Sequence, residues 1–135
     1  ASEDVVEAMT RYGRNLGIAF QIADDLLDLM GDSEITGKSL GTDLQKQKPT
    51  LPFIYIWKNA GEGERNEISA ILTGPIEQRR TGLSPWFDRY GAFDYARDRA
   101  QTYASNAIVE LQRLAPSPSR EVLEQIANFV VARSQ

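Results

Sequence analysis

Residues 3–31 carry the apolar pattern of one long α-helix, and this segment limits the possible folds more than any other. Apolar side chains recur at helical spacing, and only Gly13 and Gly17 interrupt them. At roughly 100° per residue, the apolar positions from Leu16 to Met30 occupy about 200° of the helix circumference. An arc this wide is more than a surface helix needs, so we expect the segment to be mostly buried.

The rest of the chain predicts more helices, so the expected fold class is all-α. Helical spacing or an apolar run marks four further segments: 50–60, 62–73, 92–114 and 119–133. Ser84 and Ser117 each precede a proline, which is typical of a helix N-cap followed by proline in the first turn. Residues 32–49 are rich in Gly, Ser, Thr, Asp and Lys and predict a loop. Without a repeat or a parallel-sheet pattern, we expect residues 1–135 to form a single all-α region.

The residue types that the sequence lacks exclude several kinds of site. There is no cysteine and no histidine, which excludes disulfides, zinc–thiolate sites, imidazole ligands and Ser-His-Asp triads. A metal site in this chain must therefore use oxygen ligands, which favours Mg²⁺, Mn²⁺ or Ca²⁺. The net charge of −4 gives no general attraction to nucleic acid, and no apolar run approaches the roughly 18 residues of a membrane span. We expect a cytoplasmic protein without an integral membrane segment, consistent with the lack of cysteine.

Three aspartates interrupt the apolar surface of the first helix. Asp24, Asp25 and Asp28 fall with Gln21 on a polar stripe about 100° wide, and Gly17 leaves space one to two turns before them. Like charges four residues apart destabilise a helix by about 0.2–0.5 kcal/mol, and aspartate is a poor residue for a helix interior. Two interpretations compete: a solvated acidic face, or carboxylates spaced to hold a divalent cation whose other ligands are water or phosphate oxygens.

The following loop favours the metal interpretation. Lys38, Lys46 and Lys48 come within twenty residues of Asp28, glycines provide bends between them, and Asp43 adds a further carboxylate. A lysine-rich glycine loop beside acidic metal ligands is what a Mg²⁺–diphosphate site requires. Ordinary solvation of the loop is the alternative explanation of these lysines.

Together these residues resemble the trans-isoprenyl diphosphate synthases, the polyprenyl synthetase family. The matching positions are Phe20-Gln21, Asp24-Asp25-Leu26-Leu27-Asp28, Gly37-Lys38, Gly41-Thr42-Asp43 and Lys48-Pro49-Thr50-Leu51-Pro52. They correspond to the family's second aspartate-rich motif and the segment after it, and the last helices also resemble those of the family. The family's first aspartate-rich motif, with its two arginines, has no counterpart here. The resemblance therefore implies the C-terminal half of an isoprenoid-synthase helical bundle, truncated on its N-terminal side.

The resemblance also implies a reaction and a role for each matching residue. These enzymes condense an allylic prenyl diphosphate with isopentenyl diphosphate by ionisation, condensation and elimination, using Mg²⁺, with Mn²⁺ as a possible substitute. The metal residues would be Asp24, Asp25 and Asp28, with Asp43 acting indirectly through water. Lys38 and Gln21 would be catalytic, and the allylic diphosphate would be bound by Lys38 and Lys48.

The missing half has consequences for the chain. We expect it to lack activity by itself and, because half a bundle leaves apolar faces uncovered, to form a homo-oligomer such as a dimer. Two alternatives remain open from the sequence. One is a non-catalytic subunit or paralogue of a heteromeric prenyl synthase, and the other is a helical interaction module with a solvated acidic face.

Overall fold

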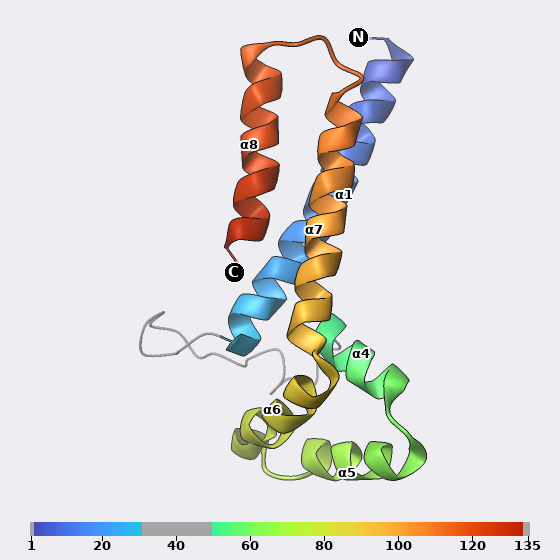
Figure 1. Cartoon of the computed structure of the whole chain (residues 1–135), viewed down its shortest axis with the longest axis vertical. Helices are drawn as coiled ribbons and strands as arrows, with labels where there is room; N and C mark the ends of the chain where they lie inside the picture. Colours follow the sequence, from blue (N-terminus) through green and yellow to red (C-terminus); the bar gives the residue numbers. More distant parts are fainter. Residues whose placement is uncertain (1, 31–49, 134–135) are drawn as a thin grey trace. The chain divides into compact units, whose positions relative to one another are not determined.

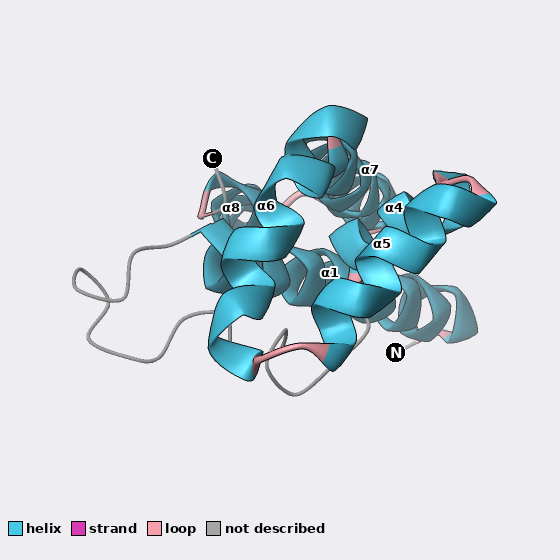
Figure 2. Ribbon diagram, turned by 90° about the horizontal axis from the view of Figure 1, so that it is seen from below, coloured by secondary structure: helices cyan, strands magenta, loops and turns pink. Residues whose placement is uncertain are grey.

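The computed structural model describes residues 2–30 and 50–133, and within these ranges every regular element is helical. The elements, shown in Figure 1, are α1 (Glu3–Met30), α4 (Leu51–Asn59), α5 (Glu62–Thr73), the short 3₁₀ helix η1 (Ile76–Gln78), α6 (Arg79–Tyr90), α7 (Ala92–Leu111) and α8 (Pro118–Ala132). Figure 2 shows the same helices from below, with loops between them. The all-α prediction is confirmed. The predicted helix ends agree to within one residue except that of α7, which ends at Leu111 rather than at residue 114.

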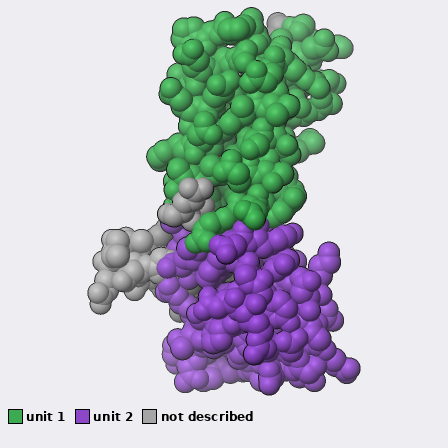
Figure 3. Space-filling model, in the orientation of Figure 1, with its two compact units in different colours: residues 1–24, 97–135 green, residues 25–96 purple. Residues whose placement is uncertain are grey.

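The chain divides into two compact units, which Figure 3 colours separately. Unit 1 contains residues 1–24 and 97–135, and unit 2 contains residues 25–96. The division passes through α1 and α7, so each of these helices contributes to both units. This division does not test the expectation that residues 1–135 form a single all-α region, which stays a prediction. No helix in the described ranges is both long and apolar enough to span a membrane.

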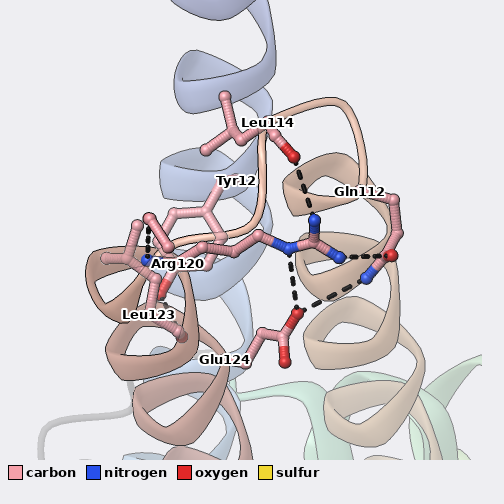
Figure 4. Close-up of polar contacts among 7 residues, drawn as sticks. Tyr12, Gln112, Leu114, Arg120, Leu123 and Glu124 are labelled. Carbon is pink, nitrogen blue, oxygen red and sulfur yellow. Dashed lines mark hydrogen bonds and ion pairs between the residues drawn. The ribbon is translucent and has the colours of Figure 1, made fainter.

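Unit 1 packs α8 with the first part of α1 and the second part of α7 around a small apolar cluster. Tyr12, Ala107 and Leu111 are buried at its centre, and three leucines pack against them: Leu16, Leu114 and Leu123. The Tyr12 hydroxyl donates a hydrogen bond of 2.7 Å to the carbonyl oxygen of Leu123, and both residues appear in Figure 4. Burial raises the pKa of the Tyr12 hydroxyl above its ordinary value of 10.0. This bond fastens α8 to α1 across 111 positions of sequence.

The first turn of α8 has the serine cap that the sequence predicts. The Ser117 hydroxyl oxygen accepts a hydrogen bond of 3.1 Å from the backbone N–H of Arg120. The Arg120 guanidinium donates to three acceptors shown in Figure 4: the Leu114 carbonyl at 2.9 Å, Gln112 Oε1 at 2.6 Å and Glu124 Oε1 at 3.4 Å. Arg120 thus joins the end of α7, the connection and the first turns of α8.

Unit 2 surrounds a second apolar cluster with α4, α5, α6 and the adjoining ends of α1 and α7. Its buried members are Leu29, Ile56, Ala60, Ile68, Leu83, Phe87 and Ala92. The rings of Tyr55 and Tyr95 stack with their centroids 4.0 Å apart, which adds an aromatic contact between α4 and α7. Proline occupies the first turn of α4, because that position has no intrahelical hydrogen bond to lose.

The predicted helix start at Ser84 is wrong. α6 begins at Arg79, directly after η1, and Pro85 lies inside the helix. Leu83 is 0% exposed and Phe87 is 3% exposed, one turn apart on either side of the proline. Fully burying two such side chains contributes roughly 3–6 kcal/mol, against a cost of about 3 kcal/mol for proline in a helix interior. Burial therefore outweighs the helix-breaking tendency that the sequence pattern emphasised.

Candidate functional site

The polar stripe of α1 provides the residues of the candidate site. Gln21 and Asp24 are exposed, and Asp28, one turn after Asp24, is half-buried. The two carboxylates of Asp24 and Asp28 therefore lie four residues apart on one helix, with partial access to solvent. Among the described residues, no atom lies within 4 Å of a Cβ atom placed on Gly17, in agreement with the open space expected before the aspartates.

Asp25 departs from the expectation of a solvent-facing stripe, because only 7% of it is exposed. At roughly 100° per residue, Asp25 lies at the edge of the polar stripe, about 40° from Leu29. Leu29 belongs to the buried cluster of unit 2, so burial of this side of the helix includes its neighbour Asp25. Asp24 and Asp28 are consequently the better placed of the three carboxylates to meet a ligand from solvent.

The predicted burial of the apolar arc is confirmed for several of its residues, and two of its large side chains are exposed. Ala19, Ala23 and Leu26 are fully buried, whereas Phe20 is 45% exposed and Met30 is 39% exposed. Partial exposure of this arc agrees with the expectation that half of a helical bundle leaves apolar faces uncovered.

A residue that the sequence analysis missed contacts the site. Arg133, at the end of α8, places its Nη2 atom 3.3 Å from Asp24 Oδ1. The carbon of the same guanidinium lies 4.9 Å from the centroid of the Phe20 ring. Because Phe20 and Asp24 are one helical turn apart, a single guanidinium reaches both. The signal in the sequence was faint: an aromatic and an acid at i, i+4 spacing, and a basic residue 109 positions away.

The other predicted site residues lie outside the described residues. Lys38, Asp43 and Lys48 all belong to residues 31–49, so the structure does not place them beside the aspartates. Their roles stay predictions.

A small pocket in unit 2 adjoins the end of α1. It has a volume of about 290 Å³ and is lined by Leu29, Met30, Arg80, Ser84, Phe87 and Phe93. Its walls are largely apolar, and the two polar residues come from α6, one turn apart. The sequence could not reveal this pocket, because the region around Ser84 was not recognised as the middle of a helix.

The donor atoms of α1 fit a divalent cation that takes part of its ligands from elsewhere. Within the described residues, no group of three or more Asp, Glu, His or Cys side chains is arranged to hold a metal ion. Asp24 and Asp28 offer carboxylate oxygens, which hard cations such as Mg²⁺ prefer. Mg²⁺ is commonly bound by one or two carboxylates together with water and substrate phosphates, so two carboxylates suit a shared site rather than an all-protein cage.

Comparison with known proteins agrees with the resemblance drawn from the motifs. Residues 1–81 match the family model described as polyprenyl synthetase. A short chain isoprenyl diphosphate synthase from Methanothermobacter thermautotrophicus is 37% identical over 132 residues, which make up 98% of this chain and 41% of that protein.

Two solved structures show that the helical arrangement is also similar. Geranylgeranyl pyrophosphate synthetase from Pyrococcus horikoshii matches with a TM-score of 0.87 and 35% identity, over 97% of this chain and 40% of its own. A polyprenyl synthase from Caulobacter crescentus, solved in complex with calcium and isoprenyl diphosphate, matches with a TM-score of 0.83 and 33% identity, over 100% of this chain and 42% of its own. The chain thus spans about two fifths of the length of these relatives and aligns with their C-terminal portion.

Proposed function

The chain belongs to the polyprenyl synthetase family, and on this basis we propose that it carries one side of the metal–diphosphate site of a prenyl diphosphate synthase. The observation that carries the proposal is the pair Asp24 and Asp28, one turn apart on α1 and accessible from solvent. The calcium and isoprenyl diphosphate bound to the Caulobacter crescentus relative support a hard cation and a prenyl diphosphate as the ligands.

The reaction proposed for the whole protein joins an allylic prenyl diphosphate to isopentenyl diphosphate. The allylic C–O bond ionises, the carbocation alkylates the double bond of the second substrate, and a proton is lost. When bound, Mg²⁺ or Mn²⁺ supplies Lewis-acid stabilisation of the leaving diphosphate and a template that orients it. No side chain is required as a covalent nucleophile, so the absence of cysteine and histidine is compatible with this chemistry.

The residues of this chain have separate tasks in that reaction. Asp24 and Asp28 bind the cation, while Asp25 and Asp43 support its water shell. Gln21, which is exposed on the same stripe, would face the reacting carbon. The diphosphate is bound by two lysines of the loop, Lys38 and Lys48.

Mg²⁺-dependent binding of inorganic diphosphate tests the proposal. Calorimetry should detect weak binding to the chain that requires Mg²⁺, because carboxylates and a diphosphate share the cation. Asp24→Ala should abolish this binding. Asp98→Ala, which removes an exposed aspartate of α7 outside the motif, should leave it unchanged. Equal binding by the chain and by Asp24→Ala would refute the metal assignment and favour a merely solvated acidic face.

The proposal also covers the behaviour of the chain by itself. The chain spans about two fifths of its relatives, so we propose that it forms no product from an allylic diphosphate and radiolabelled isopentenyl diphosphate. Product formation by the pure chain would contradict this. We further place the whole protein in the cytoplasm.

Self-association follows from an apolar stripe on α8. Val122, Ile126 and Phe129 share one face of the helix and are 52%, 42% and 66% exposed. Exposed apolar surface of this kind is typical of an interface, so we propose a homo-oligomer, most simply a dimer. Light scattering that shows a clean monomer at micromolar concentration would count against it.

A further inference from the structure

The end of α8 is fastened to α1 through one guanidinium with two different partners. Arg133 meets the Asp24 carboxylate at 3.3 Å and the face of Phe20 at 4.9 Å from the ring centroid. All three residues belong to unit 1. In the proposed function, the Asp24 carboxylate binds a cation. In this structure, the same carboxylate accepts a hydrogen bond from Arg133.

An arginine and a divalent cation are competing partners for this carboxylate. Both are positively charged and both bind through the carboxylate oxygens, so each weakens the binding of the other at close range. Asp24 supplies one accessible negative charge on the described part of the site, and Asp28 supplies another. Pairing with Arg133 neutralises the first of them before a metal ion arrives.

The pair is weak enough to be exchanged. The Arg133 side chain is 26% exposed and the Asp24 side chain is 49% exposed, so water competes for both groups. Ion pairs with this degree of exposure are easily broken and correspond to about a two- to five-fold effect on a competing equilibrium.

The aromatic contact explains why an arginine suits this position. A planar guanidinium can stack on Phe20 through its face while its edge donates to Asp24. Loss of the carboxylate contact therefore leaves the stacking contact in place. Lysine, with a compact ammonium and no planar face, would not combine the two contacts in this way.

We propose that Arg133 is a displaceable counter-ion of Asp24, which holds the carboxylate when no metal is bound and releases it when a divalent cation binds. This inference rests on the proposed function, because it requires Asp24 to be a metal ligand. Linkage makes the effect reciprocal: the factor by which Arg133 weakens metal binding is the factor by which metal weakens the attachment of the α8 end to α1. Arg133 is in this sense a positioning residue that couples the C-terminal turn of α8 to metal loading.

Titration of Mn²⁺ followed by electron paramagnetic resonance measures the competition. Arg133→Gln should lower the dissociation constant for Mn²⁺ about two- to five-fold, because no ion pair with Asp24 then has to break before the metal binds. Arg113→Gln is the matched control, since it removes the same charge from an arginine of unit 1 whose ion pair is with Glu110 at 3.8 Å. It should leave the dissociation constant unchanged. Arg133→Lys, which keeps the charge, should give a smaller change than Arg133→Gln.

Hydrogen exchange gives a second measurement. A purely structural arginine would not make the exchange rate depend on Mg²⁺. Added Mg²⁺ should speed amide exchange in the last turn of α8, around residues 129–133, in the unsubstituted chain. The same addition should have no effect there in Arg133→Gln, which has no contact left to lose. Far-UV circular dichroism establishes that each variant is folded, and Arg133→Ala, which also removes the charge, replaces Arg133→Gln should the latter be unfolded.

Asp24→Asn separates the two possible failures. If this variant binds Mn²⁺ as tightly as the unsubstituted chain, the metal site of the proposed function is wrong. If Asp24→Asn loses affinity while Arg133→Gln and Arg113→Gln behave alike, the metal site stands and the counter-ion role of Arg133 is overturned.

Discussion

The two ends of α8 each carry an arginine that contacts residues elsewhere in the chain, and the two arginines are held in different ways. Arg120, in the first turn, donates to a carbonyl, an amide oxygen and a carboxylate, and its side chain is 17% exposed. Arg133, at the other end, contacts one carboxylate and one aromatic ring, and its side chain is 26% exposed. Several bonds must break together to move Arg120, whereas one cation suffices to replace Arg133 at its carboxylate. The start of α8 is thus a structural attachment and its end an exchangeable one.

Removing the Arg120 side chain should have the largest effect on stability. Arg120→Ala leaves three acceptors without their donor, and a hydrogen bond that involves a charged group makes a net contribution of about 1.5–3 kcal/mol. We expect a loss of about 2 kcal/mol in the free energy of unfolding, measured with urea. Arg113→Ala, at an arginine whose side chain is 50% exposed, is the control and should change it by less than about 0.5 kcal/mol. Equal effects from both variants would mean that Arg120 contributes no more to stability than an exposed arginine, which would contradict its role as a structural attachment.

The middle of α8 should give an intermediate effect. Tyr12→Phe removes the hydroxyl that donates to the Leu123 carbonyl, so we expect a loss of about 1 kcal/mol at neutral pH. Burial raises the pKa of Tyr12 above 10.0, so the hydroxyl ionises less readily in the folded chain. The stability that the neutral hydroxyl contributes is complete below pH 10 and is lost as the pH rises through the folded pKa. The difference between the chain and Tyr12→Phe should therefore shrink in urea titrations above that pH, and a constant difference would contradict the pKa direction.

The end of α8 should give the smallest effect on stability. Arg133→Ala removes one partly exposed ion pair and one cation–π contact, and we expect a loss of no more than about 1 kcal/mol. Urea unfolding in the absence of divalent cations provides the measurement. A loss as large as that of Arg120→Ala would mean that the α8 end is a structural attachment, which would argue against its exchange with a metal ion.

Local sequence rules predicted most of the helices of this fold. Helical spacing located α1, α5 and α8, and the cap chemistry of Ser117 located the start of α8. The same chemistry predicted the wrong start for α6. A serine–proline pair at a helix start has the same local sequence as one inside a helix that buried neighbouring side chains stabilise. What decides between them is the burial of Leu83 and Phe87, which depends on packing that a local pattern does not contain.

The candidate site likewise has features that the sequence predicted and features that it could not predict. Spacing alone put Asp24 and Asp28 on one face of a helix, because helical geometry is local. The burial of Asp25 depends on what packs against its side of α1, and the contact of Arg133 depends on a partner 109 residues away. Both are tertiary facts, and neither has a strong signature in the sequence.

The central claim is that Asp24 and Asp28 act together as ligands of a divalent cation, and a Mn²⁺ titration of three single variants tests it most directly. Asp24→Asn and Asp28→Asn should each weaken Mn²⁺ binding by at least about tenfold, because each removes one of two charged ligands. Asp98→Asn, at an exposed aspartate outside the motif, should bind Mn²⁺ as the unsubstituted chain does. Unchanged affinity in either motif variant, or an equal loss in all three, would contradict the claim.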